Sequence, residues 1–273
     1  MNNIKKVIKN NGIFKVEDIY EQSLIDDVKK KVKSQLNHTD NKERIESDKL
    51  YELGILDQLF NSKLKYLINT IMPDGVLWHC MFLKTKSGQD KPHIKFNTKY
   101  GDWHQDRSFS YDPDRIDFLD IMIYLNDVSY DDGPFAFLSK DPSIEPNSND
   151  KTIKVIGKKG TVILSRIDWY HSATVNSGEN DRYLIRFSFQ RNAFHNPFLE
   201  LNENKLLANK YFERKDDFMA FIFGINRNWT KNVKQLEQNH EDINLINPKE
   251  NYEFNISNKL RFKNTIKKLF NFN

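Results

Sequence analysis

The chain has 273 residues, of which 13% are aromatic and 29% charged, and a formal net charge of +4. This length can bury one substantial core, and the small, dispersed net charge argues against a nucleic-acid groove. The single cysteine, Cys80, excludes an intramolecular disulfide, so we expect a cytoplasmic protein. No window reaches the roughly 18 apolar residues of a membrane-spanning helix.

Helices are predicted in the first part of the chain. The apolar spacing predicts one helix over 24–36, where Ser23 and Asp26 resemble a capping box. A second apolar stripe predicts a helix over 50–70, which the Pro-Asp-Gly turn at 73–75 ends.

From residue 76 onward the hydrophobic period changes from that of a helix to about two, which is typical of strands. Many short strands without intervening helices favour a sandwich or jelly roll over alternating strand–helix units. A helix is again expected at about 203–222. The clearest predicted strands are 76–84, 117–125, 152–156, 161–165 and 182–190.

The sequence therefore predicts one mainly β domain with flanking helices. Its expected parts are N-terminal helices over 1–75, a jelly-roll core over 76–192, a helical or irregular addition over 193–255 and a basic amphipathic tail over 256–273. No repeat or low-complexity linker divides the chain, and the oligomeric state is left open.

Two imidazoles and a carboxylate stand out within the strand-rich part. His104 and Asp106 are two residues apart, so on an extended segment both side chains point to the same side. His171, which follows a predicted strand, can supply the third ligand. Such a set holds Fe(II) on one face and leaves the other face open. An isolated histidine is more often a hydrogen-bonded core residue, but the combination favours a metal site.

An arginine is expected deeper in the same core. Arg182 opens the strand over 182–190, where its planar guanidinium can bind a carboxylate through two parallel hydrogen bonds. Arg186 faces the same side of that strand and is the rival candidate. A buried arginine needs an anion, so we expect at least one of the two to bind one.

These residues resemble the phytanoyl-CoA dioxygenase family of Fe(II)- and 2-oxoglutarate-dependent oxygenases. The resemblance covers roughly 100–190 and rests on the order of its motifs. These are His104-Gln105-Asp106, a Gly-Pro turn after Tyr124-Leu125-Asn126-Asp127, Gly160 before a strand, His171, and then Asn176 and Arg182. It implies a double-stranded β-helix, His104, Asp106 and His171 as ligands of Fe(II), and Arg182 as the clamp for 2-oxoglutarate, with O2 as the oxidant.

One departure concerns the substrate side, because 137–142 replaces the Pro-Gly-Ser-His turn common in the family. Asp106 is present, so hydroxylation is favoured over halogenation. The expected substrate is a small or medium-sized metabolite, such as a carbohydrate or a lipid- or carrier-linked acid. The alternatives are a cupin-like protein that binds metal or carboxylate without turnover, and desaturation, epimerisation or cyclisation on the same scaffold.

Some assignments keep two interpretations. One of Lys84, Thr85 and Lys86 is a candidate for contacting the co-substrate or an acidic substrate, and strand parity with Cys80 and Phe82 favours Lys84. The alternative is that these are surface residues. Trp103 and Trp169 either wall the site or belong to the core.

The tail over 256–273 carries five basic and no acidic residues, with its apolar residues on one helical face. Such a helix lies peripherally on an anionic membrane surface, here the inner one, or packs on its own domain.

Overall fold

The computed structural model describes residues 2–36, 42–92, 99–106, 112–191, 222 and 245–246. Almost all of the helix predicted over 203–222, and the whole tail over 256–273, lie outside these residues. No helix within the described ranges is long and apolar enough to cross a membrane.

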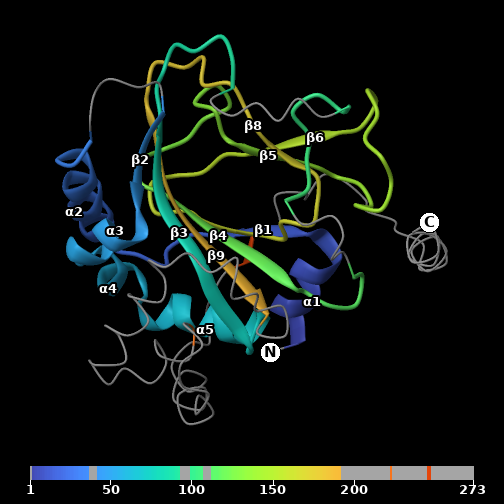
Figure 1. Cartoon of the computed structure of the whole chain (residues 1–273), viewed down its shortest axis with the longest axis horizontal. Helices are drawn as coiled ribbons and strands as arrows, with labels where there is room; N and C mark the ends of the chain where they lie inside the picture. Colours follow the sequence, from blue (N-terminus) through green and yellow to red (C-terminus); the bar gives the residue numbers. More distant parts are fainter. Residues whose placement is uncertain are drawn as a thin grey trace.

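Two antiparallel sheets form the body of the protein (Figure 1). The large sheet has the strand order β10-β1-β7-β4-β9-β3-β2 and the small one the order β6-β5-β8. This arrangement is the predicted jelly roll. The strands of the large sheet are β1 (Ile13–Val16), β2 (Lys42–Glu46), β3 (Gly75–Thr85), β4 (Phe118–Tyr124), β7 (Val162–Ser165), β9 (Arg182–Arg191) and β10 (Leu245–Ile246). Those of the small sheet are β5 (Phe135–Leu138), β6 (Thr152–Val155) and β8 (His171–Ala173).

All five predicted strands are present with ends shifted by at most one residue, as β3, β4, β6, β7 and β9. The segment 1–75 differs from the prediction because it also supplies β1 and β2. β1 pairs with β7, and β2 pairs with β3. Strands of four or five residues are too short for alternation alone to identify, so their partners decide them.

The helices are α1 (Asn2–Asn11), α2 (Gln22–Lys33), α3 (Ser47–Glu52), α4 (Ile55–Leu59) and α5 (Ser62–Ile71). The single helix predicted over 50–70 is wrong. Gly54 adopts a left-handed conformation (φ 68°) that ends one helix, and the side chain of Asn61 accepts a hydrogen bond from the Leu64 amide to begin another. The predicted capping box is also wrong, because α2 begins before Ser23.

The strands β3, β4, β7 and β9 of the large sheet are buried on both faces. On β9, Tyr183, Ile185, Phe187 and Phe189 belong to the core shared with the helices, which cover one face of the sheet in Figure 1. Leu184 belongs to a second core, between the two sheets. Since side chains alternate along a strand, Arg182, Arg186 and Ser188 point into this second, inter-sheet space. The fold thus places polar groups of β9 between the sheets.

The turn between α1 and β1 fits closely against the inter-sheet core. Gly12 has a φ of 73°, and a Cβ atom there would lie 2.2 Å from Cδ2 of Trp169. Trp169 is almost fully buried, which supports the core interpretation of this residue. Only a glycine satisfies both the backbone and the contact.

We expect Gly12→Ala to destabilise the protein more than Gly54→Ala. Both residues have positive φ, which costs an alanine about 1–2 kcal/mol, but Gly54 has no atom within 4 Å of an added Cβ. The clash with Trp169 adds about 1–3 kcal/mol to the first variant only. Urea unfolding of both variants measures the difference. Equal losses would show that Trp169 moves away at no cost.

Candidate functional site

His104, Asp106 and His171 come together between the sheets. His104 and His171 form an antiparallel bridge, in which the amide of each donates to the carbonyl of the other at 3.1 and 2.9 Å. Their side chains therefore project to the same side, with ring centroids 4.3 Å apart. One ligand atom from each of the three residues lies within 4.8 Å of the others. The predicted set is brought to one point.

The backbone orients both imidazoles. Nδ1 of His104 lies 3.0 Å from the carbonyl oxygen of Asp102, and Nδ1 of His171 lies 2.8 Å from that of Trp169. A carbonyl only accepts, so each Nδ1 carries a proton, which leaves each Nε2 as the nitrogen that can bind a metal. Both Nε2 atoms point to Oδ1 of Asp106, at 3.3 and 3.6 Å. Two nitrogen donors and one carboxylate oxygen thus converge, as a divalent transition metal requires.

The charge of the cluster favours an ionised carboxylate. Burial by itself would raise the pKa of Asp106, but the neighbouring His171, His104 and Arg186 hold that pKa far below its usual range. Conversely, burial opposes protonation of His171 while the Asp106 carboxylate raises its pKa. The Asp106 side chain is still 26% exposed. The cluster therefore has one open side from which a ligand can approach.

Arg186 holds the second oxygen of the same carboxylate. Its Nη2 donates to Oδ2 of Asp106 at 2.9 Å, and its Nε lies 2.6 Å from Oδ2 of Asp120. Asp120 in turn accepts a hydrogen bond of 2.6 Å from the Ser188 hydroxyl. Oδ1 of Asp106 thus faces the histidines and Oδ2 faces a guanidinium. This division leaves one oxygen for a metal.

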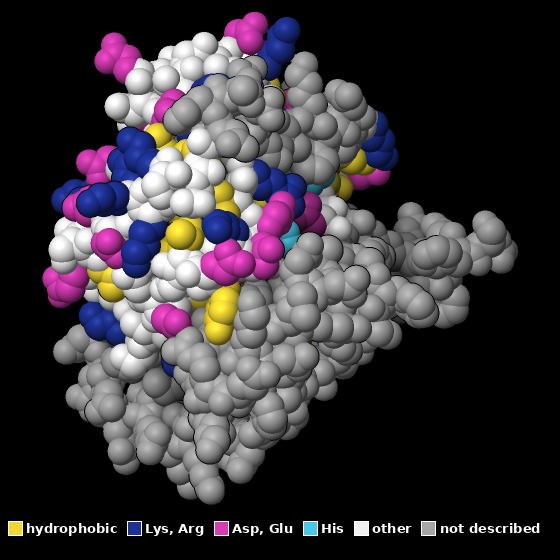
Figure 2. All heavy atoms as spheres, turned by 60° about the vertical axis from the view of Figure 1, so that its left-hand side comes forward, with side chains coloured by type: hydrophobic (Ala, Val, Ile, Leu, Met, Phe, Trp, Pro, Cys, Tyr) yellow, Lys and Arg dark blue, Asp and Glu magenta, His cyan; other side chains and the backbone are white. Residues whose placement is uncertain are grey.

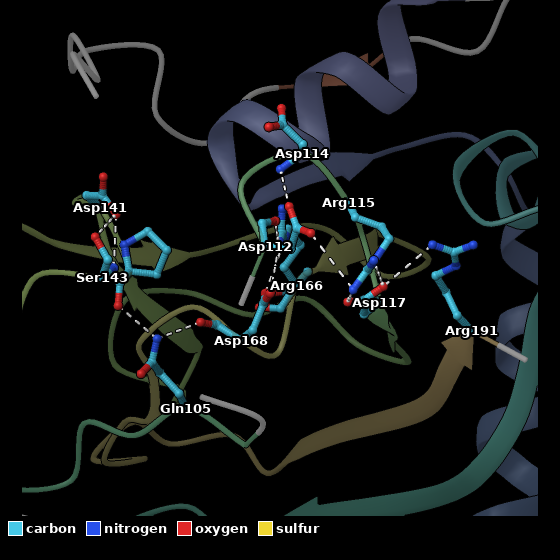
Figure 3. Close-up of polar contacts among 12 residues, drawn as sticks. Gln105, Asp112, Asp114, Arg115, Asp117, Asp141, Ser143, Arg166, Asp168 and Arg191 are labelled. Atoms are coloured by element: carbon cyan, nitrogen blue, oxygen red, sulfur yellow. Dashed lines mark hydrogen bonds and ion pairs between the residues drawn. The ribbon is translucent and has the colours of Figure 1, made fainter. Parts of the chain in front are cut away.

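A buried polar network supports the segment that carries His104 and Asp106 (Figure 3). The side-chain amide of Gln105 donates to the carbonyls of Asp168 and Pro142 at 2.6 and 3.0 Å. The Asp168 carboxylate receives two hydrogen bonds from Arg166, and both of these side chains are fully buried. A bidentate pair of this kind fixes geometry as well as charge. The two ligand-bearing segments are therefore held to each other on either side of the cluster.

A neighbouring ion-pair group occupies the end of β4 and β9 (Figure 3). Arg115 donates to both oxygens of the buried Asp117, at 2.6 and 2.9 Å, and Arg191 binds Asp74 at 2.8 Å. The Arg191 amide also donates to the Asp117 carbonyl. These contacts tie this end of the sheet together.

Arg182 lies in the inter-sheet space and is buried. Its guanidinium donates to the carbonyl of Gly133 and, at 3.0 Å, to the hydroxyl of Thr85. No carboxylate among the described residues pairs with it, and its Nε is buried without a hydrogen bond. Burial consequently lowers the pKa of Arg182. A buried cation without a counter-charge is costly, which indicates a place for an anion.

Asn176 positions the surroundings of Arg182. It is fully buried, and its amide nitrogen donates to the carbonyl of Thr85 at 3.2 Å and to that of Asn180 at 2.9 Å. It thereby fixes the strand end that presents the Thr85 hydroxyl. The Arg182 site is built on the turn between β8 and β9.

Lys84 shares the face of Cys80 and Phe82, as its parity predicts, but this face meets the helices and not the inter-sheet space. A β-bulge between Leu77 and His79 shifts the register of β3, so that Cys80 and Phe82 face the helices. Lys84 follows the same parity, and its ammonium lies 3.3 Å from Asp181. On this side of the sheet Lys84 is separated from the cluster, and Thr85 takes the interior position.

The roles of Gln105, Asp120 and Ser188 were not predicted from the sequence. Gln105 acts through neighbours that the sequence does not place. Asp120 and Ser188 had a readable signal, because a carboxylate within the apolar strand β4 and a hydroxyl within β9 need partners. Each is the partner of the other.

Solved structures of other proteins share this fold. HygX from Streptomyces hygroscopicus, crystallised with nickel and 2-oxoglutarate, has 13% identity and a TM-score of 0.52, covering 71% of this chain and 88% of its own. SnoN, a non-haem alpha-ketoglutarate-dependent epimerase from nogalamycin biosynthesis, has 14% identity and a TM-score of 0.53, covering 70% of this chain and 82% of its own. SnoK, a carbocyclase from the same biosynthesis, has 9% identity and a TM-score of 0.52, covering 70% of this chain and 84% of its own. At such low sequence identities, these similarities show that the fold is shared.

The sequence itself identifies the family. No curated protein sequence matches the chain. A profile of the phytanoyl-CoA dioxygenase (PhyH) family matches residues 14–183, which include His104, Asp106, His171 and Arg182. Because this match spans more than half of its length, the chain belongs to the phytanoyl-CoA dioxygenase family of non-haem iron- and 2-oxoglutarate-dependent enzymes.

Proposed function

We propose that the protein is a dioxygenase that hydroxylates an unactivated C–H bond of a small or carrier- or lipid-linked metabolite, using Fe(II), 2-oxoglutarate and O2. The observation that carries this proposal is the pairing of two sites. One is a cluster of two imidazoles and a carboxylate. The other is a buried guanidinium without a carboxylate partner among the described residues. A metal and a dicarboxylate satisfy both.

The iron would be held by Nε2 of His104, Nε2 of His171 and Oδ1 of Asp106. These donors fit the group because both Nδ1 atoms are already engaged by carbonyls. When bound, iron and 2-oxoglutarate supply the oxidising chemistry with O2, and the protein supplies orientation and exclusion of water. The open side of Asp106 leaves room for these ligands.

Arg182 is the better candidate for the 2-oxoglutarate clamp. Arg186 already binds two carboxylates, those of Asp106 and Asp120, so its charge is compensated. Arg182 has a neutral carbonyl and a neutral hydroxyl as its partners. The distal carboxylate of 2-oxoglutarate would bind at Arg182, and the Thr85 hydroxyl is placed to assist it.

A second outcome on the same scaffold has specific support. Proteins with this fold include a non-haem alpha-ketoglutarate-dependent epimerase and a carbocyclase. Both outcomes would use the same ligands and clamp, and the product analysed by mass spectrometry separates them, because hydroxylation alone adds one oxygen atom to the substrate. The binding protein without turnover is separated by the first experiment below.

We expect His171→Ala to lose both metal binding and turnover. Removing one of three ligands leaves two donors, so Ni(II) binding measured by calorimetry should weaken at least 10- to 100-fold, as outer-shell losses alone already do. Formation of succinate from 2-oxoglutarate with Fe(II) and ascorbate should also disappear. Ser172→Ala, the next residue on the strand, is the matched control. If the wild type binds metal but forms no succinate under any condition, the protein is a binder.

Arg182→Leu should separate stability from co-substrate binding. A charge-assisted hydrogen bond contributes about 1.5–3 kcal/mol, so the Kd for 2-oxoglutarate should rise roughly 10- to 100-fold or more. Because the variant removes an uncompensated buried charge, its Tm without 2-oxoglutarate should be equal to or above that of the wild type. The wild type should gain Tm on adding 2-oxoglutarate and the variant should not. If 2-oxoglutarate raised the Tm of the variant as much as that of the wild type, a residue other than Arg182 would be the clamp.

Arg186→Gln, unlike Arg182→Leu, should weaken the binding of metal more than the binding of 2-oxoglutarate. Without the guanidinium, Oδ2 of Asp106 and the Asp120 carboxylate lose their shared cation, so the carboxylate ligand is less well oriented. Metal affinity should fall roughly 10- to 100-fold, with 2-oxoglutarate affinity of the metal-loaded protein changing much less. Arg186→Lys should restore part of the metal affinity, because it keeps the charge and loses the fork. A larger effect on 2-oxoglutarate than on metal would make Arg186 the clamp.

A further inference from the structure

The edge strand β2 adds polar groups to the wall of the inter-sheet space. In its register, Glu46 pairs with Met81 and Arg44 with Leu83, and both partners belong to the inter-sheet core. Paired residues point to the same face of a sheet. Met81 in turn pairs with Arg186 on β9. A continuous row therefore leads from Arg186, which holds Asp106, to Glu46 at the sheet edge.

The row opens toward solvent at its outer end. The side chain of Arg186 is 22% exposed, whereas those of Glu46 and Arg44 are 42% and 43% exposed. Neighbouring strands are about 4.8 Å apart, so Glu46 stands about 10 Å from Arg186 in the direction of the row. A substrate with its reacting carbon near the metal can thus reach Glu46 if it is about the size of a disaccharide.

The Glu46 side chain does not cap the helix that follows it. It is the N-cap residue of α3, where a side-chain oxygen commonly accepts from the first helical amides, yet its side chain makes no capping hydrogen bond. Its carboxylate turns instead to Arg44, with which it forms an ion pair, and to His79. The carboxylate therefore lies with these two side chains on the inter-sheet face.

His79 is the buried member of this group. It lies opposite Ser188 in the sheet, on the same face as Arg186, and its side chain is 10% exposed. Its nearest ionic partner is Glu46 at 3.8 Å, longer than a hydrogen bond. Burial lowers the pKa of His79 to about 4, with Arg186 adding to this effect, so the imidazole is neutral at pH 7. It offers one donor and one acceptor.

These three side chains together match an uncharged polar ligand. Arg44 and Glu46 compensate each other, and a neutral His79 adds no charge, so an ionic substrate gains no net attraction here. Hydroxyl groups, which both donate and accept, can bind a carboxylate, a guanidinium and an imidazole at once. Figure 2, which turns the side of α2 to α4 forward, likewise shows acidic and basic side chains interspersed on the described surface.

We infer that Arg44, Glu46 and His79 form a recognition site for a neutral polyhydroxylated substrate, a glycoside of about two rings, that extends from the metal cluster across β3 to β2. This inference rests on the proposed function, because it takes the metal cluster as the place of reaction. It assigns specificity to three residues that have no part in holding the metal or 2-oxoglutarate.

The test uses the full chain loaded with Ni(II) and 2-oxoglutarate, which binds without turnover. Saturation-transfer NMR with maltose, sucrose and trehalose measures glycoside binding, and dodecanoate serves as the apolar, acidic probe. We expect at least one disaccharide to bind and dodecanoate not to bind. Glu46→Gln and His79→Phe should each weaken disaccharide binding at least 10-fold, while Glu52→Gln, on the neighbouring helix α3, should not.

The inference is overturned if no disaccharide binds, if dodecanoate binds more tightly than every disaccharide, or if binding survives both substitutions. Succinate formation by the wild type without any sugar distinguishes a failure of the recognition site from a failure of the proposed function. If succinate forms and sugars do not bind, only the recognition site is wrong. If neither metal nor 2-oxoglutarate binds, the proposed function fails first.

Discussion

The pair of backbone hydrogen bonds between His104 and His171 is the constraint on which the site depends. It joins two segments that are far apart in the chain and fixes both imidazoles on one face. The amide of Asp106 extends the contact by donating to the carbonyl of Ile167. Side-chain geometry at the cluster is therefore set by main-chain pairing, which varies less than rotamers do.

Buried charge is handled in two ways in the inter-sheet region. Arg166 and Arg186 have carboxylate partners, so their cost is offset within the protein. Arg182 has none among the described residues and is offset only when an anion arrives. The first kind of arginine serves structure. Under the function proposed above, the co-substrate supplies the missing counter-charge of the second kind, and the low dielectric around Arg182 makes that electrostatic contribution to binding large.

The sequence predicted the parts of the site that follow from short-range alternation. The two-residue spacing of His104 and Asp106, and the shared face of Arg182 and Arg186, depend only on extended backbone. For Lys84, alternation gave the face of Cys80 and Phe82 correctly, but whether that face meets the helices or the other sheet depends on the bulge between Leu77 and His79 and on tertiary packing. The choice between the two arginines was likewise open, since it depends on Asp120, whose proximity to Arg186 is a tertiary contact.

Trp169 serves two neighbours at once. Its indole ring packs on Gly12 at the end of the first helix, and its carbonyl oxygen sets the proton on His171. The orientation of the His171 imidazole therefore depends on how the turn at Gly12 packs against Trp169. Gly12 and Trp169 lie 157 residues apart in the chain (169 − 12). A change in the first turn of the chain can therefore disturb the His171 imidazole without touching any residue of the cluster.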